Sequence, residues 1–137
     1  MVVAFGNDYH DGYETACDTM SVYDFATNRW NQFGHRIQGT RYSFGHCANS
    51  EYIYLTNGSG RTGAMADCTL ERLPLAGLLD SSIPWESFEL ETAVNEPIAF
   101  SRSADEIAIM GGGMGMGTYK TLRIFDLTPL PPPVEEN

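Results

Sequence analysis

The sequence has 137 residues, of which 42% are hydrophobic and 19% charged, a composition typical of one globular domain. Acidic residues outnumber basic ones by 18 to 8, giving a net charge of −10. This balance argues against binding to nucleic acid or to anionic membranes, because both depend on Lys and Arg side chains.

The cysteine pattern and the hydropathy argue against disulfide-rich, zinc-binding, transmembrane and secreted classes of protein. Three cysteines without a C-x-x-C pair indicate neither a disulfide framework nor a zinc knuckle. No apolar run reaches the roughly 18 residues that a transmembrane helix needs, and the start of the sequence lacks the basic and apolar regions of a secretory signal. We therefore expect a protein of the cytoplasm or another intracellular compartment.

The residue types favour β-structure. Fourteen Gly, seven Pro and 12% aromatic residues are typical of many short strands joined by tight turns. No stretch has sustained helical periodicity. The expected fold class is therefore all-β, without long helices.

A four-residue apolar run that ends in Gly or Asn occurs three times, roughly fifty residues apart. The three segments are residues 2–7, 53–58 and 107–112. Gly and Asn tolerate a positive φ, so each segment predicts a strand followed by a turn.

A second strand-like run follows each of these turns after a variable loop. These runs are residues 20–25, 67–73 and 120–127, and the first and third end in Tyr23-Asp24 and Phe125-Asp126. In the first unit Trp30 begins a further short strand, and Trp85 stands in the comparable place in the second. The longer connection of the second unit, residues 74–83, has room for one helical turn.

Further strand candidates, residues 41–48 and 96–101, precede the second and third glycine turns. Each repeat therefore contains up to four short strands with hairpin-length links. This order is typical of a propeller blade and not of a βαβ unit.

These residues resemble the kelch repeat, in which a hydrophobic strand and a Gly-Gly turn precede a Tyr-Asp pair and a Trp. Tyr23, Asp24 and Trp30 match the second half of that pattern, and Gly111-Gly112 match the first half. The resemblance extends from Val2 to about Thr128. The second unit departs from it, with an Asn-Gly turn and no Tyr-Asp pair.

The resemblance implies a partial kelch-type β-propeller of roughly three four-stranded antiparallel blades, with incomplete terminal blades. The blades would span about 1–38, 39–92 and 93–128, followed by a proline-rich acidic tail at 129–137. Tyr23 and Trp30 are expected to be buried between blades. The residues expected to maintain the repeat are Gly6, Tyr23, Asp24, Trp30, Asn57, Gly58, Trp85, Gly111, Gly112 and Asp126.

An open arc of three blades leaves two apolar sheet faces that need a cover. A two-fold homodimer would form a six-bladed ring, whereas a second chain or missing blades would complete a longer propeller. The sequence begins at the second strand of a blade and its C-terminal prolines cannot pair in a sheet, so we favour completion by other residues.

Loops on one face of a kelch-type propeller imply binding of a protein partner, so we expect an interaction module, scaffold or adaptor and no enzyme. Aromatic and Arg side chains supply most interface energy. The contact residues expected on this basis are Tyr9, Tyr13, Arg61, Met114 and Tyr119.

The alternative is a propeller enzyme or metal-binding protein of the galactose-oxidase or sialate-epimerase type. The sequence has no counterpart of the thioether-linked Tyr and Cys of the former, and no catalytic residue of the latter can be placed on it. The glycine-rich stretch 111–121 lacks the G-K-[ST] ending of a phosphate loop. We also expect no cofactor and no metal, because the spacing of His10, His35 and His46, and of the nearby Cys47, matches no standard metal site.

Overall fold

The computed structural model describes residues 2–4, 7–10, 13–16, 20–33, 41–60, 68–114 and 117–128. Within these ranges the chain forms β-strands and one short 3-10 helix, and every strand pair is antiparallel. The fold is therefore all-β, as the composition predicted. No helix in this described part is long and apolar enough to cross a membrane.

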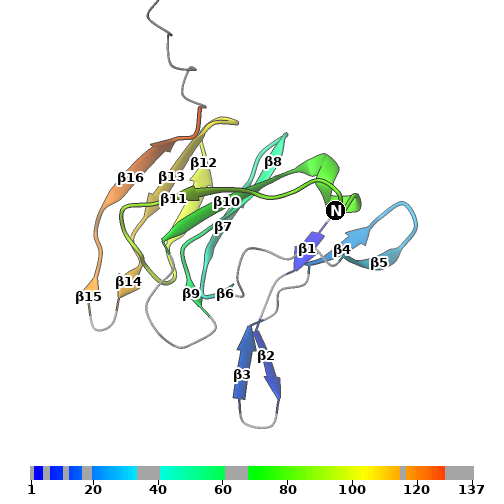
Figure 1. Cartoon of the computed structure of the whole chain (residues 1–137), viewed down its shortest axis with the longest axis horizontal. Helices are drawn as coiled ribbons and strands as arrows, with labels where there is room; N and C mark the ends of the chain where they lie inside the picture. Colours follow the sequence, from blue (N-terminus) through cyan, green and yellow to red (C-terminus); the bar gives the residue numbers. More distant parts are fainter. Residues whose placement is uncertain are drawn as a thin grey trace, which may run out of the picture.

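Three antiparallel sheets follow one another along the chain (Figure 1). Sheet 1 has the order β1 (Val2–Ala4), β4 (Met20–Asp24), β5 (Arg29–Phe33). Sheet 2 has the order β11 (Glu86–Glu89), β10 (Thr69–Pro74), β8 (Tyr52–Thr56), β7 (Gly45–Ala48). Sheet 3 has the order β12 (Ile98–Ser101), β13 (Glu106–Met110), β16 (Leu122–Asp126).

Three short two-stranded pairs extend from the same end of these sheets, which we call the loop end (Figure 1). They are β2 (Asn7–His10) with β3 (Tyr13–Ala16), β6 (Arg41–Tyr42) with β9 (Ser59–Gly60), and β14 (Gly113–Met114) with β15 (Gly117–Thr118). At the far end of β10, the 3-10 helix η1 (Leu75–Leu79) confirms the helical turn predicted in the longer connection.

The three sheets share one pairing register. Val2 pairs with Tyr23 in sheet 1, Ile53 with Leu73 in sheet 2, and Ile107 with Phe125 in sheet 3. The apolar run and the second run predicted in each unit are therefore adjacent antiparallel strands, and they meet at equivalent residues.

Positive φ angles mark the turns that end β8 and β13. The angles are 55° at Asn57, 103° at Gly58, 71° at Gly111 and 90° at Gly112. Both turns were predicted from their Gly and Asn residues, which adopt this conformation at low cost. Gly6, the expected counterpart in the first unit, lies outside the described residues.

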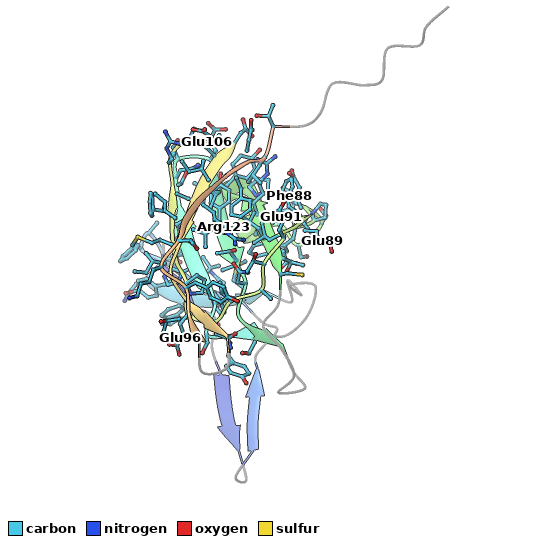
Figure 2. The ribbon with its side chains drawn as sticks, turned by 90° about the vertical axis from the view of Figure 1, so that its left-hand side faces the viewer. Phe88, Glu89, Glu91, Glu96, Glu106 and Arg123 are labelled. Carbon is cyan, nitrogen blue, oxygen red and sulfur yellow. The ribbon has the colours of Figure 1, made fainter. Side chains whose placement is uncertain are left out.

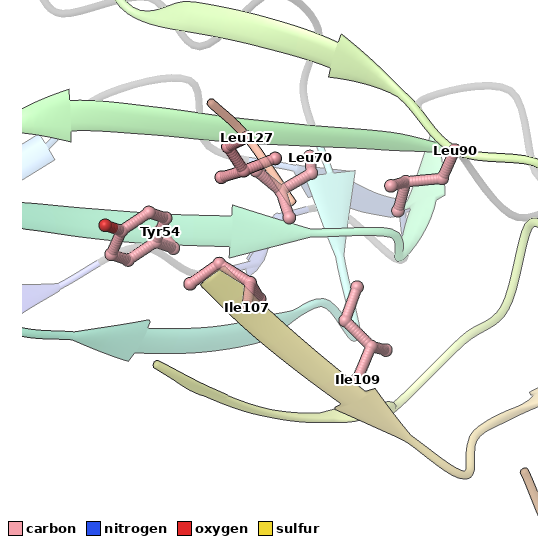
Figure 3. Packing of buried hydrophobic residues seen from close by; sticks show 6 residues of the cluster. All are labelled: Tyr54, Leu70, Leu90, Ile107, Ile109 and Leu127. Atoms are coloured by element: carbon pink, nitrogen blue, oxygen red, sulfur yellow. The ribbon is translucent and has the colours of Figure 1, made fainter. Parts of the chain in front are cut away.

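Sheet 2 is covered on both faces, because successive side chains of a strand point to opposite sides. Ile53 and Leu73 pack with Met20 and Val22 of sheet 1, and Leu78 of η1 completes this cluster. On the other face, residues of sheets 2 and 3 form a second cluster (Figure 3), which contains Tyr54, Leu70, Leu90, Ile107, Ile109 and Leu127. Burying each large apolar side chain stabilises the fold by about 1.5–3 kcal/mol, so the two clusters hold the sheets together.

The expected burial of Trp30 is wrong. Its side chain is 57% exposed, and that of its pairing partner Tyr23 is partly exposed. Both residues lie on the face of sheet 1 that points away from sheet 2, opposite to the fully buried Met20 and Val22. Trp85 instead packs against the cluster between sheets 1 and 2.

Candidate functional site

Three of the five expected contact residues belong to the short strand pairs of the loop end. In the β2–β3 hairpin Tyr9 pairs with Glu14 and Tyr13 pairs with His10. Met114 lies on β14 opposite Gly117. Figure 2 shows the β2–β3 hairpin projecting well beyond the sheets, whereas Glu106 lies at the opposite end. Arg61, the fourth expected contact, lies outside the described residues.

Tyr119, the fifth expected contact, lines a small cleft between sheets 2 and 3 that opens to solvent and has a volume of about 20 Å³, room for about one water molecule. Arg123 lines the same cleft and donates a hydrogen bond from Nη1 to Oγ1 of Thr92. The lining comprises Asn57, Leu90, Thr92, Val94, Ile109, Gly111, Tyr119, Thr121, Arg123 and Phe125. The cleft is too small to enclose a ligand, but the Tyr and Arg side chains at its border are of the types that contribute most to protein interfaces.

The glycine turns position the loop end by allowing close backbone contact. A Cβ atom on Gly112 would lie 2.8 Å from the carbonyl oxygen of Asn95. Asn95 in turn exchanges backbone hydrogen bonds of 2.7 and 2.9 Å with Gly113. A Cβ atom on Gly58 would lie 2.7 Å from the carbonyl oxygen of Tyr42. Glycine is therefore required where neighbouring segments cross these two turns.

Asn57, beside Gly58, supports the wall of the cleft with its side chain. Its amide is 1% exposed and donates from Nδ2 to the carbonyl oxygen of Thr92 at 2.9 Å. The hydroxyl of Thr56 donates to Asn57 Oδ1 at 2.8 Å. The Asn in this turn therefore adds contacts that a second glycine would lack.

A polar network joins sheets 2 and 3 at the end away from the loops. Tyr54 donates its hydroxyl to the carbonyl oxygen of Ala104 at 2.5 Å and accepts a hydrogen bond from Nδ2 of Asn49 at 3.0 Å. The same Asn49 nitrogen lies 3.0 Å from Oγ of Ser101 and from the carbonyl oxygen of Ser103. Burial raises the pKa of Tyr54, so the hydroxyl keeps the proton that it donates.

Arg72 is the buried charged residue of this network and is only 5% exposed. Its Nε bonds Glu86 Oε2 at 2.7 Å and its Nη1 bonds Asp105 Oδ1 at 3.0 Å. The guanidinium also lies over the rings of Tyr52 and Phe88, 4.5 and 5.3 Å from their centroids. Burial favours a lower pKa for Arg72, but the two carboxylate hydrogen bonds outweigh it and raise the pKa.

Sequence patterns did not reveal this network. An arginine among apolar residues of a predicted strand was the one available signal, since a buried Arg needs partners. Its partner Asp105 lies in the β12–β13 turn of sheet 3, so the pairing depends on how sheets 2 and 3 stack.

The two aspartates of the resemblance stabilise turns at strand ends. Asp24 accepts hydrogen bonds from the backbone of Ala26 and the hydroxyl of Thr27, both at 2.9 Å, and these bonds lower its pKa. Hydrogen bonds from the side chain and backbone of Thr128 lower the pKa of Asp126 in the same way. Each carboxylate therefore stabilises the turn that follows its own strand.

The described residues contain no group of three or more His, Cys, Asp or Glu side chains placed to hold a metal ion. His46 is exposed on β7, His10 lies on β2, and His35 is outside the described ranges. The half-buried Cys47 has its pKa raised to about 11 by burial. A raised pKa keeps a thiol protonated, which makes it a poor nucleophile and a poor metal ligand.

In the described part of the chain, the outer faces of two sheets carry exposed apolar side chains. The outer face of sheet 3 carries large hydrophobic side chains that are 41–60% exposed, namely Ile98, Phe100, Met110, Leu122 and Ile124. The outer face of sheet 1 carries Tyr23 and Trp30, whose rings lie 5.2 Å apart. Large exposed apolar patches mark interaction surfaces in folded proteins.

No protein-family model matches this sequence, and a search of curated proteins finds no match.

Proposed function

We propose that this chain is a segment of a kelch-type β-propeller that acts as a protein-interaction module, as a scaffold or adaptor does. The observation that carries the proposal is the threefold use of one sheet register, with the middle sheet packed on both faces. Stacked repeats of this kind cannot bury their apolar faces singly, so each sheet needs neighbours.

The loop end is the proposed binding surface. It gathers the β2–β3, β6–β9 and β14–β15 pairs, and the cleft beside them presents Tyr119 and Arg123. Tyr and Arg side chains provide large contact areas and hydrogen-bond donors, which are the properties that dominate protein interfaces. A protein partner therefore fits this end better than a small metabolite.

The two uncovered sheet faces support a larger assembly. A second chain, a homodimer or further blades of the same propeller would cover them. The net charge of −10 argues against nucleic acid or an anionic membrane as the partner. The free thiols of Cys47 and Cys68 are consistent with a reducing intracellular compartment, which we propose as the location.

Partner capture with the full chain tests the loop end. A Tyr9→Ala/Tyr13→Ala/Tyr119→Ala variant should lose the proteins that the parent chain retains, with an unchanged melting temperature. Phe25→Ala is the matched control, since this aromatic side chain is 66% exposed in the turn after β4, away from the loop end. Equal capture by both variants, or unfolding of the triple variant, would contradict a binding role of the loops.

A further inference from the structure

Five apolar side chains form one continuous surface on the outer face of sheet 3. The register places Ile98, Met110 and Leu122 side by side across the three strands. In the next row, Phe100 and Ile124 flank Ala108. Both rows lie on the face opposite to the cluster shared with sheet 2, so no described residue of another sheet covers them.

The shared register identifies what this surface corresponds to in the other sheets. Val3 pairs with Val22, Tyr54 with Arg72, and Ala108 with Ile124, so Val22, Arg72 and Ile124 are equivalent. Val22 is 0% exposed and Arg72 is 5% exposed, because each lies against the next sheet of the stack. Ile124 is 51% exposed. The equivalent residue contacts the next sheet in sheets 1 and 2, but in sheet 3 it is exposed.

The same comparison applies to the outer face of sheet 1, which points away from sheet 2. Tyr23, Leu73 and Phe125 are equivalent by register. Leu73 is fully buried against sheet 1, and Phe125 packs on the cluster shared with sheet 2. Tyr23 is partly exposed and its neighbour Trp30 is 57% exposed, and both point away from sheet 2, so no described residue of another sheet packs on them.

The two uncovered faces match the two halves of a contact already present in the chain. Between sheets 1 and 2, aliphatic Met20 and Val22 meet a surface of Ile53 and Leu73 that has Trp85 packed against it. The outer face of sheet 3 has Leu122 and Ile124 at the positions of Met20 and Val22. The outer face of sheet 1 contains a tryptophan, Trp30, as the facing surface of sheet 2 contains Trp85. This chain therefore carries a complementary surface for each of its own uncovered faces.

We propose that sheet 3 of one copy packs on sheet 1 of a second copy, and that a two-fold rotation makes the reciprocal contact identical. The inference rests on the proposed propeller segment and names its partner. A pair closed in this way has six stacked sheets and leaves neither outer face exposed. Because each copy carries a net charge of −10, the contact works against electrostatic repulsion and should tighten as salt is raised.

Sedimentation of the full chain and of single-face variants tests the proposal. The parent chain should sediment with twice its mass of 15.1 kDa. Ile124→Glu and Trp30→Glu should each sediment as single chains with unchanged circular dichroism, because both residues are exposed within one copy. Leu79→Glu is the control, since Leu79 is 52% exposed on η1 and belongs to neither face. It should remain a pair.

Mixing the two single-face variants identifies the geometry of the contact. A 1:1 mixture should recover pairs that are weaker than those of the parent. The intact sheet 3 of the Trp30→Glu copy meets the intact sheet 1 of the Ile124→Glu copy, whereas the reciprocal contact carries both Glu side chains. A single-chain mass for the parent, a pair that survives Trp30→Glu, or association that weakens with salt would each overturn the proposal. If the parent chain sediments as a single chain, and the Tyr119→Ala variant no longer captures the proteins that the parent retains, the contact between copies is contradicted and the proposed interaction module is supported.

Discussion

The guanidinium of Arg72 on sheet 2 bonds the carboxylate of Asp105 in the β12–β13 turn of sheet 3, with Nη1 and Oδ1 separated by 3.0 Å. Within the described residues this ion pair links two sheets, whereas the bond of Arg72 to Glu86 stays within sheet 2. The arginine is 5% exposed, but the side chains of both carboxylates are close to half exposed. Removal of the arginine and removal of a carboxylate should therefore have unequal effects.

We expect Arg72→Ala to lower the free energy of unfolding by about 2–4 kcal/mol, because a buried stem and its contacts with two aromatic rings are lost. Asp105→Asn should cost less than about 1 kcal/mol, since a solvent-screened carboxylate contributes little. Urea unfolding of the two variants measures both values. Equal losses would show that the ion pair, and not the packing of the arginine, dominates.

Tyr54→Phe tests the hydroxyl that reaches across the same interface. The variant removes the bonds to Ala104 and Asn49 and should cost about 1–2 kcal/mol of unfolding free energy. Tyr23→Phe is the control, because the hydroxyl of Tyr23 bonds Asn28 at the exposed turn after β4. Its stability should stay within about 0.5 kcal/mol of the parent. Equal effects of the two changes would argue that Tyr54 does not bridge the sheets.

Adjacent glycines of one turn should differ in their tolerance of a methyl group. Gly111→Ala should cost about 1 kcal/mol, because φ is positive but the nearest atom to the new Cβ, the carbonyl oxygen of Tyr119, would be 3.7 Å away. Gly112→Ala should cost more, since its Cβ would meet Asn95 at 2.8 Å and Val94 at 3.0 Å. Thermal unfolding ranks the two variants. The reverse order would contradict the close crossing at the loop end.

The thiol of Cys47 should alkylate slowly in the folded chain. Its pKa is about 11, against 9.0 for an unperturbed thiol, so its thiolate fraction at pH 8 is lowered by about a hundredfold. The rate should rise with pH up to that value and should increase when urea unfolds the chain. Peptide mass spectrometry after timed iodoacetamide treatment follows Cys47 separately from the other thiols. An unfolded-like rate at pH 8 would contradict its burial.

Local signals were sufficient to predict most strands and turns. The apolar run before Asn57-Gly58 and the one before Gly111-Gly112 are the strands β8 and β13, because left-handed turn residues end a strand wherever it lies in a fold. Asp24 likewise acts within its own turn, through bonds to residues two and three positions away. Such features depend on short-range geometry that a single sequence contains.

Burial and contacts between sheets were harder to predict. Trp30 stands at the position of the tryptophan in the kelch pattern, where a core residue is expected. Its side chain is buried only if another sheet packs on that face of sheet 1. The Arg72–Asp105 pair depends on the stacking of two sheets and leaves no local motif. Among the expected contact residues, Tyr119 lies on the cleft, and the partner-binding role of all five stays a prediction.

Methyl nuclear Overhauser contacts test the stacking of the three sheets most directly. With Ile, Leu and Val methyl groups labelled, we expect cross-peaks from Val22 to Ile53 or Leu73, and from Leu70 to Ile107, because each set shares one buried cluster. Cross-peaks that instead placed Ile53 beside Ile107, or the absence of contacts from Val22 to sheet 2, would contradict a middle sheet held between two others.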